Sequence, residues 1–463
     1  MKYIPYEYQK RATQFVIDHA ECGLLLDMGL GKSVITLTAI QNLIDDCDIS
    51  RALVVAPKKV AETTWSSEAE KWEHLRGLKV VKVSGTEAQR IAALSEDADV
   101  YVLGRDNFVW LVSAYKGLLP FDMLVIDELT SFKNPGSQRF KAMRIARPRM
   151  KRVVGLTGTP APNGLMDLWG QIYCLDMGKR LGKSVTRYRD TYFDAHRWNN
   201  IIVRCSVKKG CDEIIRNLIS DICLSMQAKD YLQLPDMIIH DIPIELPPRT
   251  MDAYRKFERD NVLEFTKSHT GELDKVLANS AAGLMNKLSQ FANGAVYDDE
   301  HNVHDVHTDK ADKLAEIVEA ANGESILVFY QFKHDIPRII DRLKGYKVEV
   351  YTTEKQLRDW NDGKIDVLLA HPASTAYGLN MQQGGHYIVW FGTGWDLELF
   401  QQANARLHRQ GQRHPVTIYK LICKGTIDER ASASLKSKRG KQQSLLDSLN
   451  YLIRKYDNDN GKG

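Results

Sequence analysis

The sequence lacks long hydrophobic runs, paired cysteines and a strong net charge. No apolar stretch reaches the roughly 18 residues of a membrane-spanning helix, and the N-terminus has no apolar core of a secretory signal. The 7 cysteines form no Cys-x-x-Cys pair, which argues against a zinc site or a disulfide framework. We therefore expect a cytoplasmic protein without a membrane partner. The net charge of +4 permits nucleic-acid binding but does not require it.

The apolar residues that are present form two series of short runs. The length of 463 residues favours two domains with accessory segments. Continuous β-branched and leucine-rich runs, each followed by a polar or glycine break, are typical of buried parallel strands. The expected strands are residues 23–26, 52–56, 80–83, 100–103, 123–126 and 152–156, and then 325–330, 347–351, 366–370, 387–391 and 416–421.

Between the two series the pattern becomes helical. Residues 251–264 and 275–291 have the periodicity of amphipathic helices. The sequence therefore predicts an α/β protein in which two parallel-sheet lobes have helical insertions between them.

A glycine-rich loop follows the first expected strand and precedes a helical pattern. Gly29 and Gly31 allow backbone amides to close around phosphate oxygens, and the helix N-terminus adds positive charge. Lys32 is expected to reach the β- and γ-phosphates of ATP, and Ser33 to offer its hydroxyl to Mg²⁺. A strict phosphate-loop pattern has glycine where Leu26 stands, so a helix-opening turn with a surface lysine is the alternative. The predicted nucleotide-binding residues of this loop are Met28, Gly29, Leu30, Gly31, Lys32 and Ser33.

Two acids end the expected strand 123–126. The carboxyl ends of parallel strands are where open α/β sheets bind ligands. We expect Asp127 to hold Mg²⁺ and Glu128 to orient and deprotonate the attacking water. Taken alone, such a pair is as often a solvated loop start.

A basic segment in the second series is a candidate for charge stabilisation. Gln402, Arg406 and Arg409 are spaced i, i+4 and i+7, which predicts one helical face. The two arginines are predicted to stabilise transition-state charge on the γ-phosphate held by the other lobe. The alternative is a solvated basic face.

These motifs occur together with others in an order that resembles one family. The resemblance is carried by residues 28–33, 53–57 with Trp65, 127–128, 156–163, 327–329 with 331–332, 378–380, Gln402 with 406–412, and 425–429. The chain resembles the SNF2 family of helicase superfamily 2 over nearly its whole length. The resemblance implies two RecA-like lobes that use ATP and Mg²⁺. The expected division is 1–245 for lobe 1, with a helical protrusion at about 165–230, then a helical connector at 246–306 and lobe 2 at 307–463.

The resemblance also implies roles for single residues. Gln9 is expected to recognise adenine, although a surface position on an N-terminal helix is the alternative. Gly378 and Gln402 are expected to lie near the nucleotide. Thr157 and Thr159 are expected to couple the nucleotide state to DNA. The implied contacts with the phosphate backbone of DNA are Lys58, Arg105, Asn107, Thr157, Gln331, Ser374 and Thr375. Loop residues of these types are often merely solvated.

The resemblance implies a motor that moves on double-stranded or branched DNA. The alternatives are a true helicase or branch-migration enzyme of recombination or repair, and an ATP-binding DNA scaffold without turnover. Residues 374–378 lack the glycine pair of chromatin remodellers, and 225–229 lack the paired arginines of the family. These departures and the short length favour a compact phage or bacterial type. We also expect a monomer, and the sequence leaves open whether protein partners supply targeting.

Overall fold

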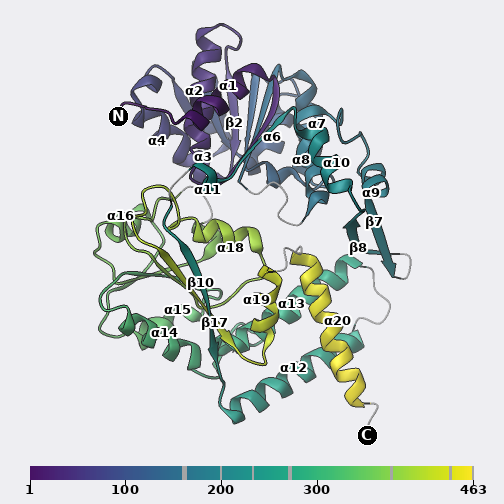
Figure 1. Cartoon of the computed structure of the whole chain (residues 1–463), viewed down its shortest axis with the longest axis vertical. Coiled ribbons are helices and arrows are strands. Elements are labelled where there is room, and N and C mark those ends of the chain that lie inside the picture. Colours follow the sequence, from purple (N-terminus) through teal and green to yellow (C-terminus); the bar gives the residue numbers. More distant parts are fainter. Residues whose placement is uncertain are drawn as a thin grey trace. The chain divides into compact units, whose positions relative to one another are not determined.

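The chain folds into two compact units, Met1–Gln233 (unit 1) and Leu234–Gly463 (unit 2) (Figure 1). The computed structural model describes residues 1–158, 164–198, 201–231, 234–268, 274–375, 379–436 and 441–460. Each unit contains one large parallel sheet with helices, so the predicted fold class is confirmed.

The sheet of unit 1 has seven strands in the order β3-β4-β2-β5-β6-β1-β9, and every neighbouring pair is parallel. Its strands are β1 (Glu21–Leu26), β2 (Ala52–Ala56), β3 (Val80–Val83), β4 (Val100–Gly104), β5 (Met123–Asp127), β6 (Arg152–Thr157) and β9 (Cys223–Met226). All six strands predicted for this part of the chain are present. Strands β2 and β4 are buried along their whole length, which explains why their sequences are uninterrupted apolar runs.

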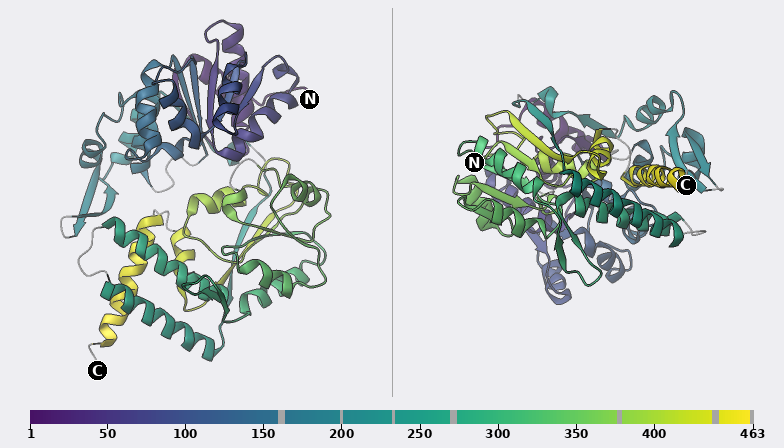
Figure 2. Two further views of the ribbon diagram at one scale, coloured as in Figure 1. Left: turned by 180° about the vertical axis from the view of Figure 1, so that it is seen from behind. Right: turned by 90° about the horizontal axis from the view of Figure 1, so that it is seen from below.

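The left view of Figure 2 shows helices on both sides of this sheet. The helices of unit 1 are α1 (Glu7–Asp18), α2 (Lys32–Asp45), α3 (Lys58–Glu62), α4 (Thr64–Lys71), α5 (Glu87–Ser95), α6 (Phe108–Ala114), α7 (Gln138–Ala146), α8 (Leu168–Asp176), α9 (Val185–Tyr192), α10 (Cys211–Ile219) and α11 (Ala228–Tyr231).

The segment at about 165–230, expected to be a helical protrusion, is not wholly helical. Besides α8, α9 and α10 it contains an antiparallel hairpin of β7 (Phe193–Trp198) and β8 (Ile201–Val207). It also contains β9, which pairs with β1 and so extends the sheet of unit 1. The chain therefore returns to the sheet before it leaves unit 1.

The sheet of unit 2 has six parallel strands in the order β10-β17-β16-β13-β15-β14. They are β10 (Met237–Ile244), β13 (Ile326–Phe329), β14 (Val348–Val350), β15 (Val367–Ala370), β16 (Tyr387–Trp390) and β17 (Val416–Cys423). Alternate residues of β13 belong to different cores: Leu327 and Phe329 pack on one face of the sheet, Ile326 and Val328 on the other. All five predicted strands are present. Strand β10 was not predicted, and its pairing with β17 places residues 237–244 in unit 2, whereas we expected lobe 1 to continue to residue 245.

A helical layer of unit 2 has a core of its own. It is built from α12 (Pro248–Ser268), α13 (Asp274–Asn293), α19 (Ile427–Lys436) and α20 (Lys441–Asn460). The predicted helices 251–264 and 275–291 lie within α12 and α13. The remaining elements of unit 2 are the hairpin β11 (Ala295–Tyr297) and β12 (Val303–Asp305), and the helices α14 (Asp309–Ala320), α15 (Asp335–Arg342), α16 (Glu354–Asn361), α17 (Pro372–Thr375) and α18 (Leu397–Asn404).

Candidate nucleotide site

The loop between β1 and α2 has the backbone of a phosphate-binding loop. Gly29 and Gly31 have φ angles of 86° and 81°, a region that favours glycine. Gly31 is the N-cap of α2, so the amides of the first helical turn open onto this loop. The Lys32 ammonium donates hydrogen bonds to the carbonyls of Leu26 and Asp27, at 2.8 and 3.3 Å, and is therefore held over the loop.

Gln9 packs directly against the same loop. It lies on α1 and is only 6% exposed, which places it inside unit 1 and not at a surface. Its Nε2 is 3.5 Å from the carbonyl oxygen of Leu30, while its Oε1 accepts a hydrogen bond from the Tyr6 amide at 3.0 Å. A Cβ atom on Gly31 would lie 2.8 Å from Gln9 Nε2, so a side chain at position 31 would displace the glutamine.

The acidic pair lies at the carboxyl end of β5. Asp127 Oδ2 accepts a hydrogen bond from the indole N–H of the fully buried Trp65, at 3.0 Å. Burial and the neighbouring Glu128 carboxylate raise the pKa of Asp127 to about 6, although the Trp65 hydrogen bond and the Lys32 charge oppose this. The Asp127 carboxylate is therefore close to Lys32 and costly to ionise without a cation nearby.

Glu128 has a left-handed backbone, with φ 61° and ψ 65°. This conformation is unfavourable for a residue with a Cβ atom. The carboxylate is held by the Thr130 hydroxyl, which donates to Oε1 at 2.7 Å, and more loosely by the Thr157 hydroxyl at 3.4 Å. Backbone strain of this kind persists only where the surrounding structure maintains it, and it concentrates at functional positions.

Strand β6 lies between β1 and β5 and joins these features. Its register pairs Thr157 with Leu25 of β1, and Leu156 with Asp127 of β5. Thr157 is fully buried and contacts Glu128 on one side. On the other side, a Cβ atom on Gly158 would lie 3.3 Å from Met28 Cγ and 3.6 Å from Lys32 Nζ. The structure thus brings the glycine loop, the acidic pair and Thr157 together at the carboxyl ends of three adjacent strands.

The prediction that Arg406 and Arg409 of unit 2 share one helical face with Gln402 is wrong. Gln402 lies on α18, but this helix ends at Asn404, so Arg406 and Arg409 are not on a continuous helical face. After Asn404 the amides of Arg406 and Leu407 bond to carbonyls three residues back, as in tight turns. The Asn404 side chain accepts a hydrogen bond from the buried indole of Trp390, at 2.9 Å. Arg406 Nε returns to the carbonyl of Gln402 at 3.0 Å.

Both arginines are fixed by backbone carbonyls of unit 2. Arg406 is 7% exposed, and Arg409 Nη1 donates to the carbonyl of Leu379 at 3.0 Å. Gln412 organises the segment that follows, because its Nε2 lies within 3.3 Å of three carbonyl oxygens and its Oε1 accepts from two backbone amides. These positions are held by tertiary hydrogen bonds and not by helical periodicity.

Three of the predicted DNA contacts gather in unit 1. Lys58 begins α3 directly after β2, and Arg105 and Asn107 lie in a short 3₁₀ helix directly after the neighbouring β4. A Cβ atom on Gly104 would lie 3.7 Å from Lys58 Cα and 3.9 Å from Asn107 Nδ2. The Lys58 side chain is 77% exposed. These residues therefore lie at one end of two adjacent strands.

Three further predicted contacts lie at the ends of two adjacent strands of unit 2. Gln331 follows β13, while Ser374 and Thr375 form the end of α17 after β15. Thr375 is fully buried and its hydroxyl donates to Pro372 at 3.0 Å, while the Ser374 hydroxyl donates to His371 at 2.7 Å. Gly378 and Thr159 lie outside the described residues.

The donor set of unit 1 fits a magnesium ion bound together with nucleotide phosphates. Mg²⁺ commonly takes only one or two protein oxygens and completes its shell with phosphates and water. Ser33 follows Lys32 at the start of α2, and the Asp127 carboxylate lies near that lysine. Across the described part of the chain, no group of three or more His, Cys, Asp or Glu residues could hold a metal by itself. No helix among the described residues is long and apolar enough to cross a bilayer.

Two contributors to the site were not predicted as site residues. In the sequence, Trp65 is one of the residues that carry the family resemblance but has no predicted role, and no motif indicates a role for Thr130. Trp65 reaches Asp127 because α4 begins shortly after β2, and β2 is the neighbour of β5 in the sheet. Only the order of the strands reveals this proximity, and the sequence does not state that order.

Comparisons with known proteins agree with this geometry. The chain matches the SNF2-related domain over residues 8–294 and the helicase conserved C-terminal domain over residues 309–411. It is 36% identical to protein p41 of Acyrthosiphon pisum secondary endosymbiont phage 1, over 96% of this chain and 99% of p41. It is 25% identical to the uncharacterized ATP-dependent helicase MG018 of Mycoplasma genitalium, over 96% of this chain but only 43% of that protein.

Among solved structures, the helicase domain of Pyrococcus furiosus Hef superposes with a TM-score of 0.55 at 15% identity, covering 94% of this chain and 98% of that domain. This likeness supports the fold, in which each unit is a RecA-like lobe.

Proposed function

The chain belongs to the SNF2-related family of helicase-like ATPases, and from this membership we propose that it hydrolyses ATP to move along duplex DNA. Such a motor would displace bound proteins or remodel branched DNA. The observation that best supports the proposal is the meeting of the glycine loop, Thr157 and the acidic pair at the ends of three adjacent strands.

ATP is proposed to bind at the β1–α2 loop. The amides after Gly31 donate hydrogen bonds to phosphate oxygens. The Lys32 ammonium leaves the carbonyls of Leu26 and Asp27 and binds the β- and γ-phosphates instead. Gln9 is proposed to recognise the adenine base, and its contact with the Leu30 carbonyl beside Gly31 supports this role.

Hydrolysis is proposed to depend on the acidic pair. Glu128 orients the attacking water and accepts its proton, and the Thr130 hydroxyl fixes the direction of that carboxylate. Ser33 and Asp127 would hold Mg²⁺, which when bound neutralises charge on the phosphate oxygens. The Trp65 indole fixes one oxygen of Asp127 and so sets its orientation.

Arg406 and Arg409 are proposed to stabilise the charge that develops on the γ-phosphate during hydrolysis. Guanidinium groups suit this role because their planar donors match phosphate oxygens. If the proposal holds, unit 1 alone binds ATP but turns it over poorly.

The DNA track is proposed to contact Lys58, Arg105 and Asn107 in unit 1, and Gln331 and Ser374 in unit 2. Contacts of this kind are made to phosphates, so binding is independent of sequence and falls steeply with salt. Thr157 is proposed to transmit the state of the nucleotide, because it touches the catalytic carboxylate. Thr157 was also assigned a direct contact with DNA, and this role is less well supported because the residue is buried.

The test is phosphate release by the whole chain with single-stranded, duplex, forked and four-way DNA. We expect the largest stimulation with duplex-containing DNA and loss of release in Lys32→Ala. Displacement of a triplex-forming strand without unwinding of a forked duplex supports translocation. Unwinding without triplex displacement refutes it in favour of a true helicase. No ATP hydrolysis with any DNA refutes the motor altogether and leaves an ATP-binding scaffold.

A further inference from the structure

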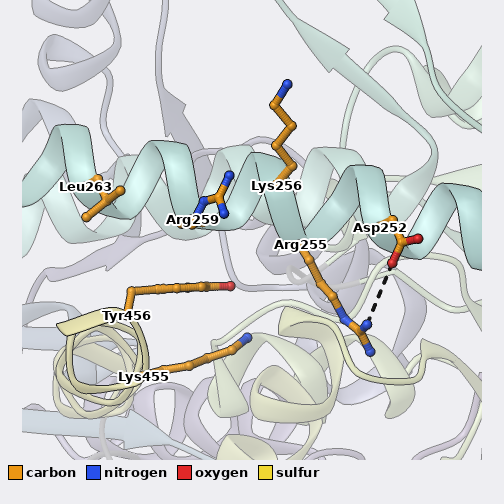
Figure 3. A pocket seen from close by; sticks show the side chains of 7 residues that line it. All are labelled: Asp252, Arg255, Lys256, Arg259, Leu263, Lys455 and Tyr456. Carbon is orange, nitrogen blue, oxygen red and sulfur yellow. Dashed lines mark ion pairs between the residues drawn. The ribbon is translucent and has the colours of Figure 1, made fainter. Parts of the chain in front are cut away.

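Unit 2 contains a basic groove, formed by α12 and α20, that has no part in the proposed nucleotide chemistry. Figure 3 shows Arg255 projecting from α12 on the side where Lys455 and Tyr456 of α20 extend. The Arg255 guanidinium turns to Asp252, and Lys256 points to the other side of α12. The cavity has a volume of about 500 Å³. It is lined by Asp252, Arg255, Lys256, Arg259, Leu263, Lys455 and Tyr456.

Cationic side chains outnumber acidic ones in the lining. Four of its seven residues are Arg or Lys, and one is acidic. The α12 residues 252, 255, 256, 259 and 263 are spaced i, i+3, i+4, i+7 and i+11, so they share one face of the helix. Arg255 and Arg259 are one turn apart, a rise of about 6 Å along the axis.

The groove has a rigid base. Val262 and Phe265 of α12 and Leu449, Leu452 and Tyr456 of α20 belong to the apolar core of the helical layer. Below the lining, the carboxylate of Glu258, which is 3% exposed, accepts a hydrogen bond from the Tyr456 hydroxyl at 2.5 Å and pairs with Lys455. The shape of the groove therefore does not depend on Arg255 or Arg259.

The two arginines are held only loosely by acids. Arg255 is 66% exposed and lies 3.7 Å from Asp252, while Arg259 is 53% exposed and lies 3.5 Å from Asp260. Exposed pairs of this kind contribute little to stability. A dianionic or polymeric phosphate can therefore displace these carboxylates at small cost.

We propose that this groove binds the phosphodiester backbone of duplex DNA as a second contact, separate from the motor residues. The proposal rests on the proposed function, which supplies the duplex. The charges are complementary, because Arg255, Lys256 and Arg259 line the groove and each strand of a duplex carries one phosphate about every 3.4 Å along the axis. The alternative of an acidic peptide is less well supported, because peptide grooves bury apolar anchors and Leu263 is the one aliphatic residue of the lining.

The test compares the full chain with the variant Arg255→Ala/Arg259→Ala in fluorescence anisotropy with a labelled duplex of mixed sequence. We expect affinity to fall by roughly tenfold at low salt, and the slope of log affinity against log salt to decrease by about 2, one for each lost phosphate contact. ATP hydrolysis without DNA and the melting temperature should not change. Arg255→Lys/Arg259→Lys should retain most of the affinity because it keeps both charges.

A matched control is Arg342→Ala. Arg342 lies on α15 of unit 2, is also 53% exposed and also pairs with an acid, Asp312. We expect this variant to bind duplex like the unmodified chain.

Two results would overturn the inference while leaving the proposed function intact. One is a double alanine variant with unchanged duplex affinity and salt slope. The other is a labelled polyglutamate peptide that loses its binding in the double variant while duplex affinity is unchanged, which would assign the groove to an acidic protein. An unmodified chain that fails to bind duplex at all would instead refute the proposed function.

Discussion

Two replacements of Glu128 should separate the chemistry of this residue from its backbone. Glu128→Gly and Glu128→Ala both remove the carboxylate and its hydrogen bond with Thr130. They differ in how each replacement tolerates φ 61° and ψ 65°. Alanine keeps the strain of a left-handed residue, whereas glycine adopts this region freely.

The sign of the stability difference follows from this geometry. The left-handed conformation destabilises the alanine variant by roughly 1–2 kcal/mol. The glycine variant avoids this cost but loses roughly 0.5–1 kcal/mol, because glycine has more conformational freedom to lose on folding. Glu128→Gly should therefore be more stable than Glu128→Ala by about 1 kcal/mol. For a unit of this size, that corresponds to a melting temperature higher by about 2–4 °C. At an ordinary helical or extended position the order is reversed.

Turnover should fall in both variants to the same extent. Loss of a positioned general base costs about 10²–10⁴-fold, or roughly 3–5 kcal/mol of barrier. Calorimetric melting without nucleotide gives the stability order, and phosphate release with duplex DNA gives the turnover. Affinity for a fluorescent ATP analogue should stay close to that of the unmodified chain.

Lys116 provides the control for the backbone effect. It is exposed, lies in unit 1 and has φ 48°. Lys116→Gly should again be more stable than Lys116→Ala, while turnover stays unchanged. The reasoning is refuted if Glu128→Ala is as stable as Glu128→Gly, or if either Glu128 variant hydrolyses ATP within tenfold of the unmodified chain.

Four further changes test other parts of the site. Lys32→Ala should weaken ATP binding and abolish turnover, and retained binding by calorimetry would contradict the assigned phosphate contact. Arg409→Ala should bind ATP normally but lower turnover by about 10³-fold, and an unchanged rate would show that Arg409 does not stabilise the transition state. Gln9→Ala should weaken ATP binding while leaving GTP binding as it was, so equal losses for both nucleotides would argue against adenine recognition. Thr157→Val should keep basal hydrolysis but reduce its stimulation by duplex, and full stimulation would remove Thr157 from the coupling path.

Most strands of both sheets were predictable because of where they lie. Central strands of a parallel sheet are covered on both faces, so β2 and β5 are continuous apolar runs with polar residues only at their ends. The same polar ends carry the site, which is why Asp127 and Glu128 could be identified. The glycine loop was predictable for a similar reason, because a left-handed turn before a helix demands glycine.

Other features depended on contacts that the sequence does not display. Strand β10 contains Pro243 and polar residues and lies at the edge of its sheet, so it lacks the apolar run of a central strand. The helical spacing of Arg406 predicted a longer helix, but the backbone turns tightly after Asn404. Arg409 is instead held by a tertiary hydrogen bond to the Leu379 carbonyl, which local periodicity does not show.

Strand β10 also has a consequence for biosynthesis. All strands of unit 1 have been made by Met226, so that unit can fold while the rest of the chain is still being synthesised. Strand β10 emerges next, but its partner β17 follows much later, since Met237 pairs with Val416. Until then Met237, Ile238 and Ile239 form an unpaired apolar edge, and even in the finished fold they are more than 40% exposed. Premature termination before Val416 would therefore release a chain with a folded first lobe and an aggregation-prone strand attached to it.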